Sequence, residues 1–543
     1  MSASDKPRGR GVPDRVEIYD TTLRDGSQRE GLSLTVHDKL RVAEQLDHLG
    51  VDYIEGGWPG ANPKDEEFFA RAPSELRLEH SQLVAFGSTR RAGVKADDDD
   101  VLRNLVKAGT STVCIVAKSW DYHVREALRT TEDEAVAMTS DSVEFLRAAG
   151  LEVFLDAEHF FDGFKGNPAF ALRVIRAALE AGASRLVLCD TNGGTLPHDV
   201  EWITSEVRAA LPDAVLGVHF HNDAGCAVAN ALAAVTQGVV QVQGCINGYG
   251  ERTGNANLCT IIPNLTLKMG VETLSPDRLA LLTPVSHHIA EIVNLTLDPQ
   301  TPYVGTSAFT HKAGLHTSAI VRAPDAYEHV RPDTIGNLTR FVVSELAGKS
   351  TVALKASEVG LHLTDAQLTD VLETLKTLEH VGYHFEAADG SFELLLRGAT
   401  GWEQEFFRLE SFRVTMDKRA DGAVSTEATI KLHARGERII ATAEGNGPVH
   451  ALDQALRQAI GQAHPALGGI HLTDYKVRVL DTHRGTGAVT RVLLDSADGE
   501  RSWSTIGVSE NIIEASWAAL SDSIVYGLLQ AETGGDTAPE GDA

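Results

Sequence analysis

The first half of the chain alternates short apolar runs with segments of helical periodicity. Eight runs rich in β-branched residues predict strands at Val16–Asp20, Asp52–Gly56, Leu83–Gly87, Thr112–Ala117, Glu152–Ala157, Arg185–Asp190, Val215–Phe220 and Val239–Cys245. In the intervening segments apolar residues recur every three to four positions, which predicts helices such as Val36–Leu49, Asp97–Ala108, Thr131–Ala149 and Pro168–Ala181. Strands that alternate with helices form parallel sheets, and eight such units over roughly 250 residues predict a closed TIM (β/α)8 barrel. We expect this barrel at residues 15–275.

A doubly wound open sheet is the alternative fold for the same pattern. That fold often carries a GxGxxG fingerprint, in which glycines after an early strand let the backbone approach a phosphate. No such fingerprint follows an early strand here. The barrel is therefore the favoured α/β architecture.

The pattern changes twice after the predicted barrel. Residues 276–405 read mainly as helical subdomains, with helices expected at Asp277–Asn294, Ser344–Val359 and Asp365–Val381 and a loop-rich stretch at 301–336. Residues 406–531 read as alternating strands in which one unit occurs twice, since Gly422-Ala423-Val424 recurs as Gly487-Ala488-Val489. Each copy predicts three strands and a helix, so a duplicated α+β domain is expected. It lacks a dense cluster of acids and histidines, which favours binding or assembly over chemistry.

Composition narrows the class of protein. A hydrophobic content of 43% and a charged content of 23% are typical of globular proteins. The formal charge of −27 argues against a nucleic-acid partner, because phosphate binding needs a basic surface. No apolar run is expected to reach the roughly 18 residues of a membrane span, and residues 1–14 lack the apolar core of a signal peptide. The predicted location is the cytoplasm, with a disordered leader at 1–14 and a disordered tail at 532–543.

The cysteines do not suggest disulfides or a thiolate metal site. The five are Cys114, Cys189, Cys226, Cys245 and Cys259. None belongs to a CxxC motif, and most lie in apolar runs, so we interpret them as small core residues.

Polar residues gather at the predicted carboxyl ends of three strands. Arg24 and Asp25 follow the first strand, His219 and His221 end the seventh, and Asn255 lies in the glycine-rich loop after the eighth. Two histidines at i and i+2 of an extended segment point the same way. Closure of a barrel brings the last strand beside the first, so we expect the three loops to converge where barrel active sites lie. Two oxygens and two imidazoles then predict an open divalent metal site for Mn, Mg, Co or Zn.

Two other interpretations of these residues remain open at this point. The His-x-His pair alone fits structural histidines about as well as metal ligands. A 2-His-1-carboxylate set also occurs in iron oxygenases, but the barrel and the additional Asn255 argue against that use.

Two further strand ends carry candidate site residues. The fifth strand ends in Asp156-Ala157-Glu158, which places both carboxylates on one face. Glu158 is the candidate for proton transfer, whereas Asp156 fits a hydrogen-bonding role at the strand end equally well. After the sixth strand, the hydroxyl of Thr191 is a candidate for binding a substrate carboxylate.

These motifs resemble the DRE-TIM metallolyase superfamily, in particular the acyltransferases that condense acetyl-CoA with an α-keto acid. Leu23–Gln28 followed by Lys39 matches one family signature, and His219–Gly225 matches the other. The resemblance spans essentially the whole chain. The duplicated domain is similar to the regulatory domain of isopropylmalate and citramalate synthases, where end-product amino acids bind. A homodimer is implied as well.

The resemblance also implies roles for individual residues. Arg24 would bind the keto acid and stabilise the charge that develops on its carbonyl oxygen. His316 and Tyr327 match the catalytic histidine and tyrosine of the family. Together with Glu158 they are the candidates for taking a proton from the acetyl group, and their roles are not apportioned. By themselves, a loop histidine and a lone tyrosine would be weak signals.

Within the family the chain is most similar to the citramalate synthase subfamily. The segments that carry this similarity are Glu55–Lys64, Phe86–Arg91 and Glu158–Gly163, with Gly56 and Trp58 departing from the isopropylmalate synthase pattern. The resemblance implies condensation of pyruvate, acetyl-CoA and water to citramalate and CoA, in isoleucine biosynthesis, with isoleucine as a feedback inhibitor. The alternatives are 2-isopropylmalate synthase activity on 2-oxoisovalerate, a lyase, and a non-catalytic amino-acid sensor.

Overall fold

The computed structural model describes residues 11–312, 319–320, 322–323, 326–342, 348–480, 482–499 and 501–533. It divides into two compact units. The first comprises Met1–Phe309 and Glu328–Thr339, and the second Thr310–Tyr327 and Arg340–Ala543. Residues 276–309 therefore belong with the barrel, whereas the domain limits expected at 275 and 405 stay predictions.

Eight parallel strands close a barrel in the order β1 to β8. They are β1 (Glu17–Asp20), β2 (Tyr53–Gly57), β3 (Gln82–Ser88), β4 (Thr112–Lys118), β5 (Glu152–Glu158), β6 (Arg185–Asp190), β7 (Leu216–Phe220) and β8 (Gln241–Gly244). Closure comes from β1, which pairs with β8 from Glu17 opposite Gln241 to Asp20 opposite Gly244. The predicted TIM barrel is confirmed, and the open sheet is excluded because both edge strands are paired.

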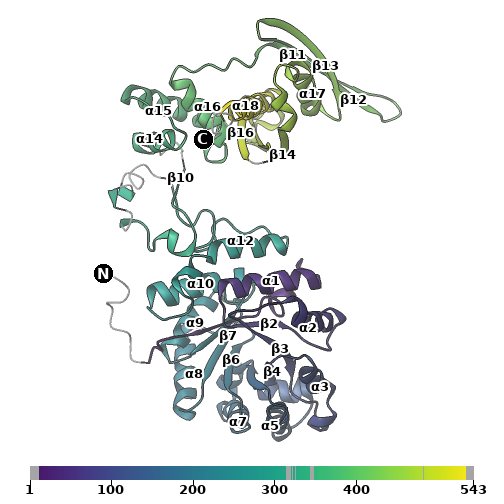
Figure 1. Cartoon of the computed structure of the whole chain (residues 1–543), viewed down its shortest axis with the longest axis vertical. Helices are drawn as coiled ribbons and strands as arrows, with labels where there is room; N and C mark the ends of the chain where they lie inside the picture. Colours follow the sequence, from purple (N-terminus) through teal and green to yellow (C-terminus); the bar gives the residue numbers. More distant parts are fainter. Residues whose placement is uncertain are drawn as a thin grey trace, which may run out of the picture. The chain divides into compact units, whose positions relative to one another are not determined.

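Helices surround the strands of this unit (Figure 1). They are α1 (Val36–Leu49), α2 (Pro63–Glu75), α3 (Asp100–Lys107), α4 (Asp121–His123), α5 (Glu132–Ala148), α6 (Phe160–Gly166), α7 (Pro168–Glu180), α8 (Pro197–Ala210), α9 (Ala227–Thr236), α10 (Leu258–Pro263), α11 (Pro276–Leu279) and α12 (Leu282–Ile292). Local sequence sets many of their ends. In α1, Thr35 and Asp38 form a capping box at the start, and Gly50 ends the helix with a φ of 89°.

The helix expected at Asp277–Asn294 is two helices, α11 and α12. Pro284 explains the break. Proline has no N–H to donate to the carbonyl of residue 280, and its ring would clash with that carbonyl in a continuous helix. The chain therefore restarts the helix at Leu282, where Pro284 lies in the first turn.

The barrel interior is packed, not open. Tyr19, Tyr53, Val84, Phe86, Cys114 and Phe154 form an apolar cluster inside it. The rings of Tyr53 and Phe154 meet edge to face, with centroids 5.1 Å apart. Because this cluster fills the interior, the space for a ligand lies at the carboxyl ends of the strands.

Among its described residues, the second unit includes the helices α14 to α16 and a duplicated α+β domain. The helices are α14 (Lys349–Glu358), α15 (Asp365–His380) and α16 (Asp389–Ala399), and two short strands, β9 (Thr310–His311) and β10 (Arg340–Phe341), pair with each other. The first repeat is β11 (Arg408–Lys418), β12 (Val424–Ala434), β13 (Glu437–Gly445) and α17 (Pro448–Ile460). The second is β14 (His471–Val479), β15 (Thr490–Ala497), β16 (Ser502–Ser509) and α18 (Ile512–Thr533). Each repeat has an antiparallel three-stranded sheet, so the predicted duplication is confirmed.

One described helix, α18, is long and apolar enough to span a membrane, with 61% of the stretch buried inside the protein. The expectation that no apolar segment is long enough to span a membrane was therefore wrong, judged by length and composition alone. The apolar character of α18 has another cause, because Trp517, Leu520, Ile524 and Leu528 belong to the core of the duplicated domain.

Candidate metal centre and active site

Asp25, His219 and His221 converge at the carboxyl end of the barrel. The Oδ2 atom of Asp25 lies 3.2 Å from Nε2 of His219 and 3.5 Å from Nε2 of His221. The two Nε2 atoms are 3.4 Å apart. All three side chains are buried. Three ligand atoms directed at one point form the kind of site that binds a divalent metal.

A hydrogen bond to Gln243 orients His219. The Nδ1 atom of His219 lies 3.0 Å from Oε1 of Gln243, and the Gln243 amide in turn donates to Oδ1 of Asp156 at 3.0 Å. Because the amide nitrogen is committed to Asp156, the amide oxygen accepts the Nδ1–H of His219. The Nε2 lone pair then points at the centre, as metal-binding histidines require.

Asn255 lies beside the end of β7. A bridge between the backbones of Asn255 and His221 ties the loop after β8 to the end of β7. The Asn255 amide nitrogen donates to the carbonyl of Tyr249 at 3.0 Å. Its Oδ1 atom and Nδ1 of His221 are buried without a hydrogen-bond partner in the described part of the chain. Buried polar atoms are rarely left unpaired, so the unpaired Oδ1 atom of Asn255 fits a metal ligand.

The electrostatics of the three residues suit a cation. Burial opposes the charge on Asp25, but Arg24 and the two imidazoles outweigh it and hold the pKa of this carboxyl well below its usual range. Burial and the neighbouring His219 lower the pKa of His221 to about 4. For His219, burial lowers the pKa, but the Asp25 carboxylate outweighs it and the pKa is raised. A neutral His221 and an ionised Asp25 are the forms that bind metals.

Arg24 is held rigidly beside this centre. Its Nε atom donates to Oε1 of Glu55 at 2.5 Å, and its guanidinium stacks over the Phe86 ring, 3.8 Å from the centroid. Glu55 also accepts the hydroxyl of Tyr19 at 2.7 Å. The guanidinium lies 3.6 Å from Asp25, so a fixed positive charge lies next to the candidate metal ligands.

The two carboxylates of β5 have different environments. Glu158 forms an ion pair with Lys118 at the end of β4 and lines the cavity of the site. Asp156 is buried deeper, where it accepts hydrogen bonds from Cys114 and Gln243, and burial raises its pKa. Both carboxylates line the cavity, and Glu158 is the one that is less buried and paired with a lysine.

Thr191 lies on the cavity wall with its hydroxyl oriented by the backbone. Its Oγ1 atom accepts the N–H of His159 at 3.0 Å. His159 adopts a φ of 54°, a backbone conformation that residues other than glycine rarely adopt. Since the oxygen already accepts one hydrogen bond, the hydroxyl hydrogen is the part of Thr191 available to a ligand.

These residues enclose a cavity of about 230 Å³. Its apolar wall is Trp58, Phe86 and Val116. Its other lining residues are Arg24, Asp25, Gln28, Asp156, Glu158, Cys189, Thr191, His219, His221, Glu251 and Arg252. A second cavity of about 630 Å³ shares Arg24, Gln28 and Trp58 with the first and runs along the loops after β1 and β2. The site therefore combines a small polar pocket with a larger adjoining space.

The roles of two further candidate site residues, His316 and Tyr327, are not tested by the structure. His316 lies outside the described residues. Tyr327 is described, belongs to the second unit and is 46% exposed. The roles assigned to both by resemblance stay predictions.

Sequence reasoning missed four residues that support the site: Glu55, Lys118, Gln243 and Arg252. Glu55 offered a signal, because a carboxylate in the middle of a fully buried strand needs a cationic partner. Gln243 offered the same kind of signal in β8. Lys118 and Arg252 offered none, since charged residues at strand ends are common.

The fold and site define a barrel protein of the HMGL-like type with an appended α+β domain. The HMGL-like family model matches residues 15–282, the homocitrate synthase post-HMGL domain-like model matches 303–382, and the LeuA allosteric (dimerisation) domain matches 386–528. Among solved structures, the HMG-CoA lyase of Bacillus subtilis covers 53% of this chain and 96% of its own, at 23% identity and a TM-score of 0.45.

Full-length relatives narrow the class further. An (R)-citramalate synthase of Streptomyces coelicolor is 53% identical over 523 residues, covering 96% of this chain and 98% of the relative. One from Aquifex aeolicus is 49% identical, covering 96% and 100%. A probable 2-isopropylmalate synthase of Methanopyrus kandleri is 33% identical, covering 93% and 97%. The chain belongs to the (R)-citramalate synthase family.

Proposed function

We propose that this chain condenses acetyl-CoA with pyruvate and water, giving (R)-citramalate and free CoA. The observation that carries the proposal is the buried Asp25–His219–His221 centre with Arg24 beside it, in a chain 53% identical to an (R)-citramalate synthase. The small polar pocket suits a keto acid, and the adjoining cavity of about 630 Å³ offers room for a longer second substrate.

The donor set fits a divalent ion. Asp25, His219, His221 and Asn255 would hold Mn, Mg, Co or Zn, because nitrogen and oxygen ligands with open positions suit these metals. When bound, such an ion would act as a Lewis acid on the keto oxygen. The protein residues carry the remaining tasks.

Arg24 and Thr191 would bind and orient the keto acid. The guanidinium of Arg24, fixed by Glu55 and Phe86, would stabilise the negative charge that grows on the carbonyl oxygen during carbon–carbon bond formation. The hydroxyl of Thr191 would donate to the substrate carboxylate. Neither group needs to move, which is how a fixed donor lowers a barrier.

A base must take a proton from the acetyl methyl group. Glu158 is the described candidate, because its carboxylate lines the cavity and Lys118 holds it there. His316 and Tyr327 are proposed to share this work. Hydrolysis of the thioester would then release CoA.

The alternative is 2-isopropylmalate synthase activity. A methyl group and an isopropyl group differ by only a few kcal/mol in a hydrophobic pocket, so the choice depends on the wall formed by Trp58, Phe86 and Val116. The test is release of CoA thiol by metal-loaded protein with each keto acid. We expect release with pyruvate, little with 2-oxoisovalerate, and none after chelation. Preference for 2-oxoisovalerate, or activity that survives chelation, would overturn the proposal.

A non-catalytic amino-acid sensor is the alternative from another class. The complete set of Arg24, Asp25, Glu158, His219 and His221 at one cavity argues against it. A metal-loaded sample without turnover on any keto acid would favour it.

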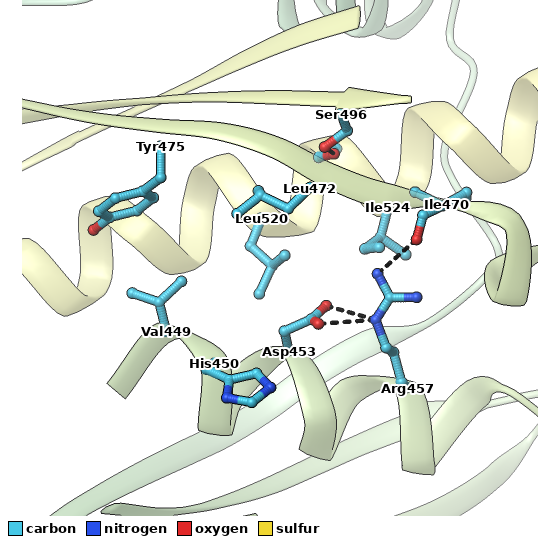
Figure 2. Close-up of a pocket in the computed structure, with 11 residues that line it drawn as sticks. Val449, His450, Asp453, Arg457, Ile470, Leu472, Tyr475, Ser496, Leu520 and Ile524 are labelled. Carbon is cyan, nitrogen blue, oxygen red and sulfur yellow. Dashed lines mark hydrogen bonds and ion pairs between the residues drawn. The ribbon is translucent and has the colours of Figure 1, made fainter. Parts of the chain in front are cut away.

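We further propose that the duplicated domain binds isoleucine and inhibits the reaction. A cavity of about 350 Å³ lies between α17, α18 and the start of β14. Figure 2 shows Val449, Leu472 and Leu520 around one space, with Asp453 and Arg457 paired beside it. An apolar wall next to a carboxylate suits an amino acid with a branched side chain, since Asp453 can accept from an α-amino group.

A homodimer and a cytoplasmic location complete the proposal. The LeuA allosteric (dimerisation) domain matched at residues 386–528 supports self-association. Sedimentation at several protein concentrations would show a species of twice the chain mass if the homodimer forms.

A further inference from the structure

The glycine-rich loop after β8 contains an arginine in a strained conformation. Arg252 has a φ of 55°, and its neighbours Gly250 and Gly254 also have positive φ values of 150° and 95°. A residue with a side chain in this region costs on the order of 1 kcal/mol or more. Such a conformation persists only where other contacts hold it, so the contacts of Arg252 are informative.

The guanidinium of Arg252 joins three loops. Its Nε and Nη2 atoms form a bidentate pair with Asp223, at 2.8 and 2.9 Å. The Nη2 atom also donates to the backbone carbonyl of Thr191 at 2.8 Å. The loops after β6, β7 and β8 are thereby connected through one side chain.

Each connected loop carries part of the proposed site. Thr191 is on the loop after β6, Asp223 follows His221 by two residues, and Asn255 follows Arg252 by three. Thr191 is held from two sides, because His159 donates to its hydroxyl oxygen while Arg252 donates to its carbonyl. The second contact fixes the backbone from which the hydroxyl reaches the cavity.

We propose that Arg252 is a positioning residue for keto-acid binding. It acts through Thr191, whose hydroxyl it holds against the cavity, and this inference rests on the proposed function. The side chain of Arg252 is 43% exposed, and exposed ion pairs contribute little to folding stability. The planar guanidinium donates to a carboxylate and to a carbonyl at the same time. The ammonium group of lysine does not reproduce this geometry.

The test is a double-mutant cycle in the full-length, metal-loaded protein. We expect Arg252→Met to raise the KM for pyruvate about tenfold, the scale of one charge-assisted hydrogen bond, with kcat nearly unchanged. Thr191→Val should raise the KM as well. In the Thr191→Val background, the additional effect of Arg252→Met should vanish, because the hydroxyl that Arg252 positions is gone. Arg252→Lys should behave like Arg252→Met.

Two results would overturn the inference. If Arg252→Met raised the KM equally in both backgrounds, the guanidinium would contact the substrate directly. If Arg252→Met left the KM unchanged in a protein whose parent turns over pyruvate, Arg252 would have no role in binding. Absence of turnover in the parent protein would instead contradict the proposed function.

A matched control separates positioning from stability. Arg185 forms an equivalent bidentate pair with Glu17, at 3.0 and 2.7 Å, at the opposite end of the barrel. Arg185→Met should leave the KM for pyruvate unchanged. Calorimetry of pyruvate binding without acetyl-CoA provides a second readout. Asp223→Asn provides a second variant, because it removes the ion pair that holds Arg252 and should therefore also weaken pyruvate binding.

Discussion

Asp20, the last residue of β1, and Asp25, in the loop after it, differ in their hydrogen-bond partners. Asp20 is fully buried, and its carboxylate accepts from the backbone and hydroxyl of Thr22 and from the backbone of Ile246. Burial raises the pKa of Asp20 to about 7 despite these bonds. Asp25 faces Arg24 and two imidazole nitrogens instead. Its oxygens face groups that could bind the same metal ion, so Asp25 is the member of the pair that we propose as a metal ligand.

Arg24 provides the sharpest prediction at this scale. Arg24→Lys should lower kcat by roughly a hundredfold or more, because a lysine loses the fixed geometry that Glu55 and Phe86 impose on the guanidinium. The KM for pyruvate should change much less, since the interaction strengthens as charge develops on the carbonyl oxygen. Steady-state kinetics at saturating metal measure both. Arg29→Lys, on the exposed side of the same loop, is the control, and an unchanged kcat for Arg24→Lys would contradict the role.

At the scale of elements, the two repeats of the C-terminal domain are alike in their sheets and different in their helices. Both sheets are antiparallel and three-stranded, and each is followed by one helix. However, α18 is 22 residues long against 13 for α17, and it also packs on α16. Asp522 of α18 accepts the hydroxyl of Ser391 in α16 at 2.7 Å. The longer helix therefore joins the duplicated domain to the helices before it.

This contact predicts an unusual dependence of stability on pH. Burial raises the pKa of Asp522 to about 6, whereas an unfolded aspartate titrates near 3.9. The folded state therefore keeps a proton that the unfolded state loses, and the contribution of Asp522 to stability declines as pH rises from about 4 to about 6. The decline amounts to at most about 3 kcal/mol.

Asp522→Asn removes this titration and keeps an acceptor for Ser391. The difference in unfolding free energy, variant minus parent, should be more positive at pH 7.5 than at pH 4.5. Urea unfolding followed by tryptophan fluorescence measures it. Asp417→Asn, on the exposed strand β11, serves as the comparison. Equal stability differences at both pH values would rule out a perturbed Asp522.

At the scale of the whole molecule, regulation requires that a ligand in the C-terminal domain change the reaction in the barrel. The cavity proposed for the effector is lined entirely by the second unit, whereas the candidate metal ligands Asp25, His219 and His221 belong entirely to the first. Isoleucine can inhibit only if it binds the less active state more tightly, and typical coupling of this kind is about 1–3 kcal/mol.

Filling the cavity tests this coupling. Val449→Trp should abolish inhibition by isoleucine and isoleucine binding, because the indole occupies the space between α17 and α18, while turnover without isoleucine stays near that of the parent. Val424→Trp places the same ring on the exposed start of β12 and should leave inhibition intact. Turnover against isoleucine concentration and calorimetry measure the two effects. Undiminished inhibition of the Val449→Trp variant would place the effector elsewhere.

Elements with strong local signals were predictable from the sequence. The helix Val36–Leu49 was predicted with its observed bounds, because a capping box and a glycine mark its ends. The break between α11 and α12 was missed, since an apolar period continues across Pro284. In the site, the ligand set followed from motifs, whereas Lys118, Gln243 and Arg252 depend on neighbours that come from other strands.

The sequence by itself determined the order of strands and helices, the duplication and the residue types that suit a metal, because periodicity, capping and motif spacing are local properties of a chain. Only the tertiary structure decided the register in which β8 pairs with β1, which nitrogen of His219 is directed at Asp25, and which arginine connects the loops of the site. These depend on distances between segments that are far apart in the chain, and packing alone sets such distances.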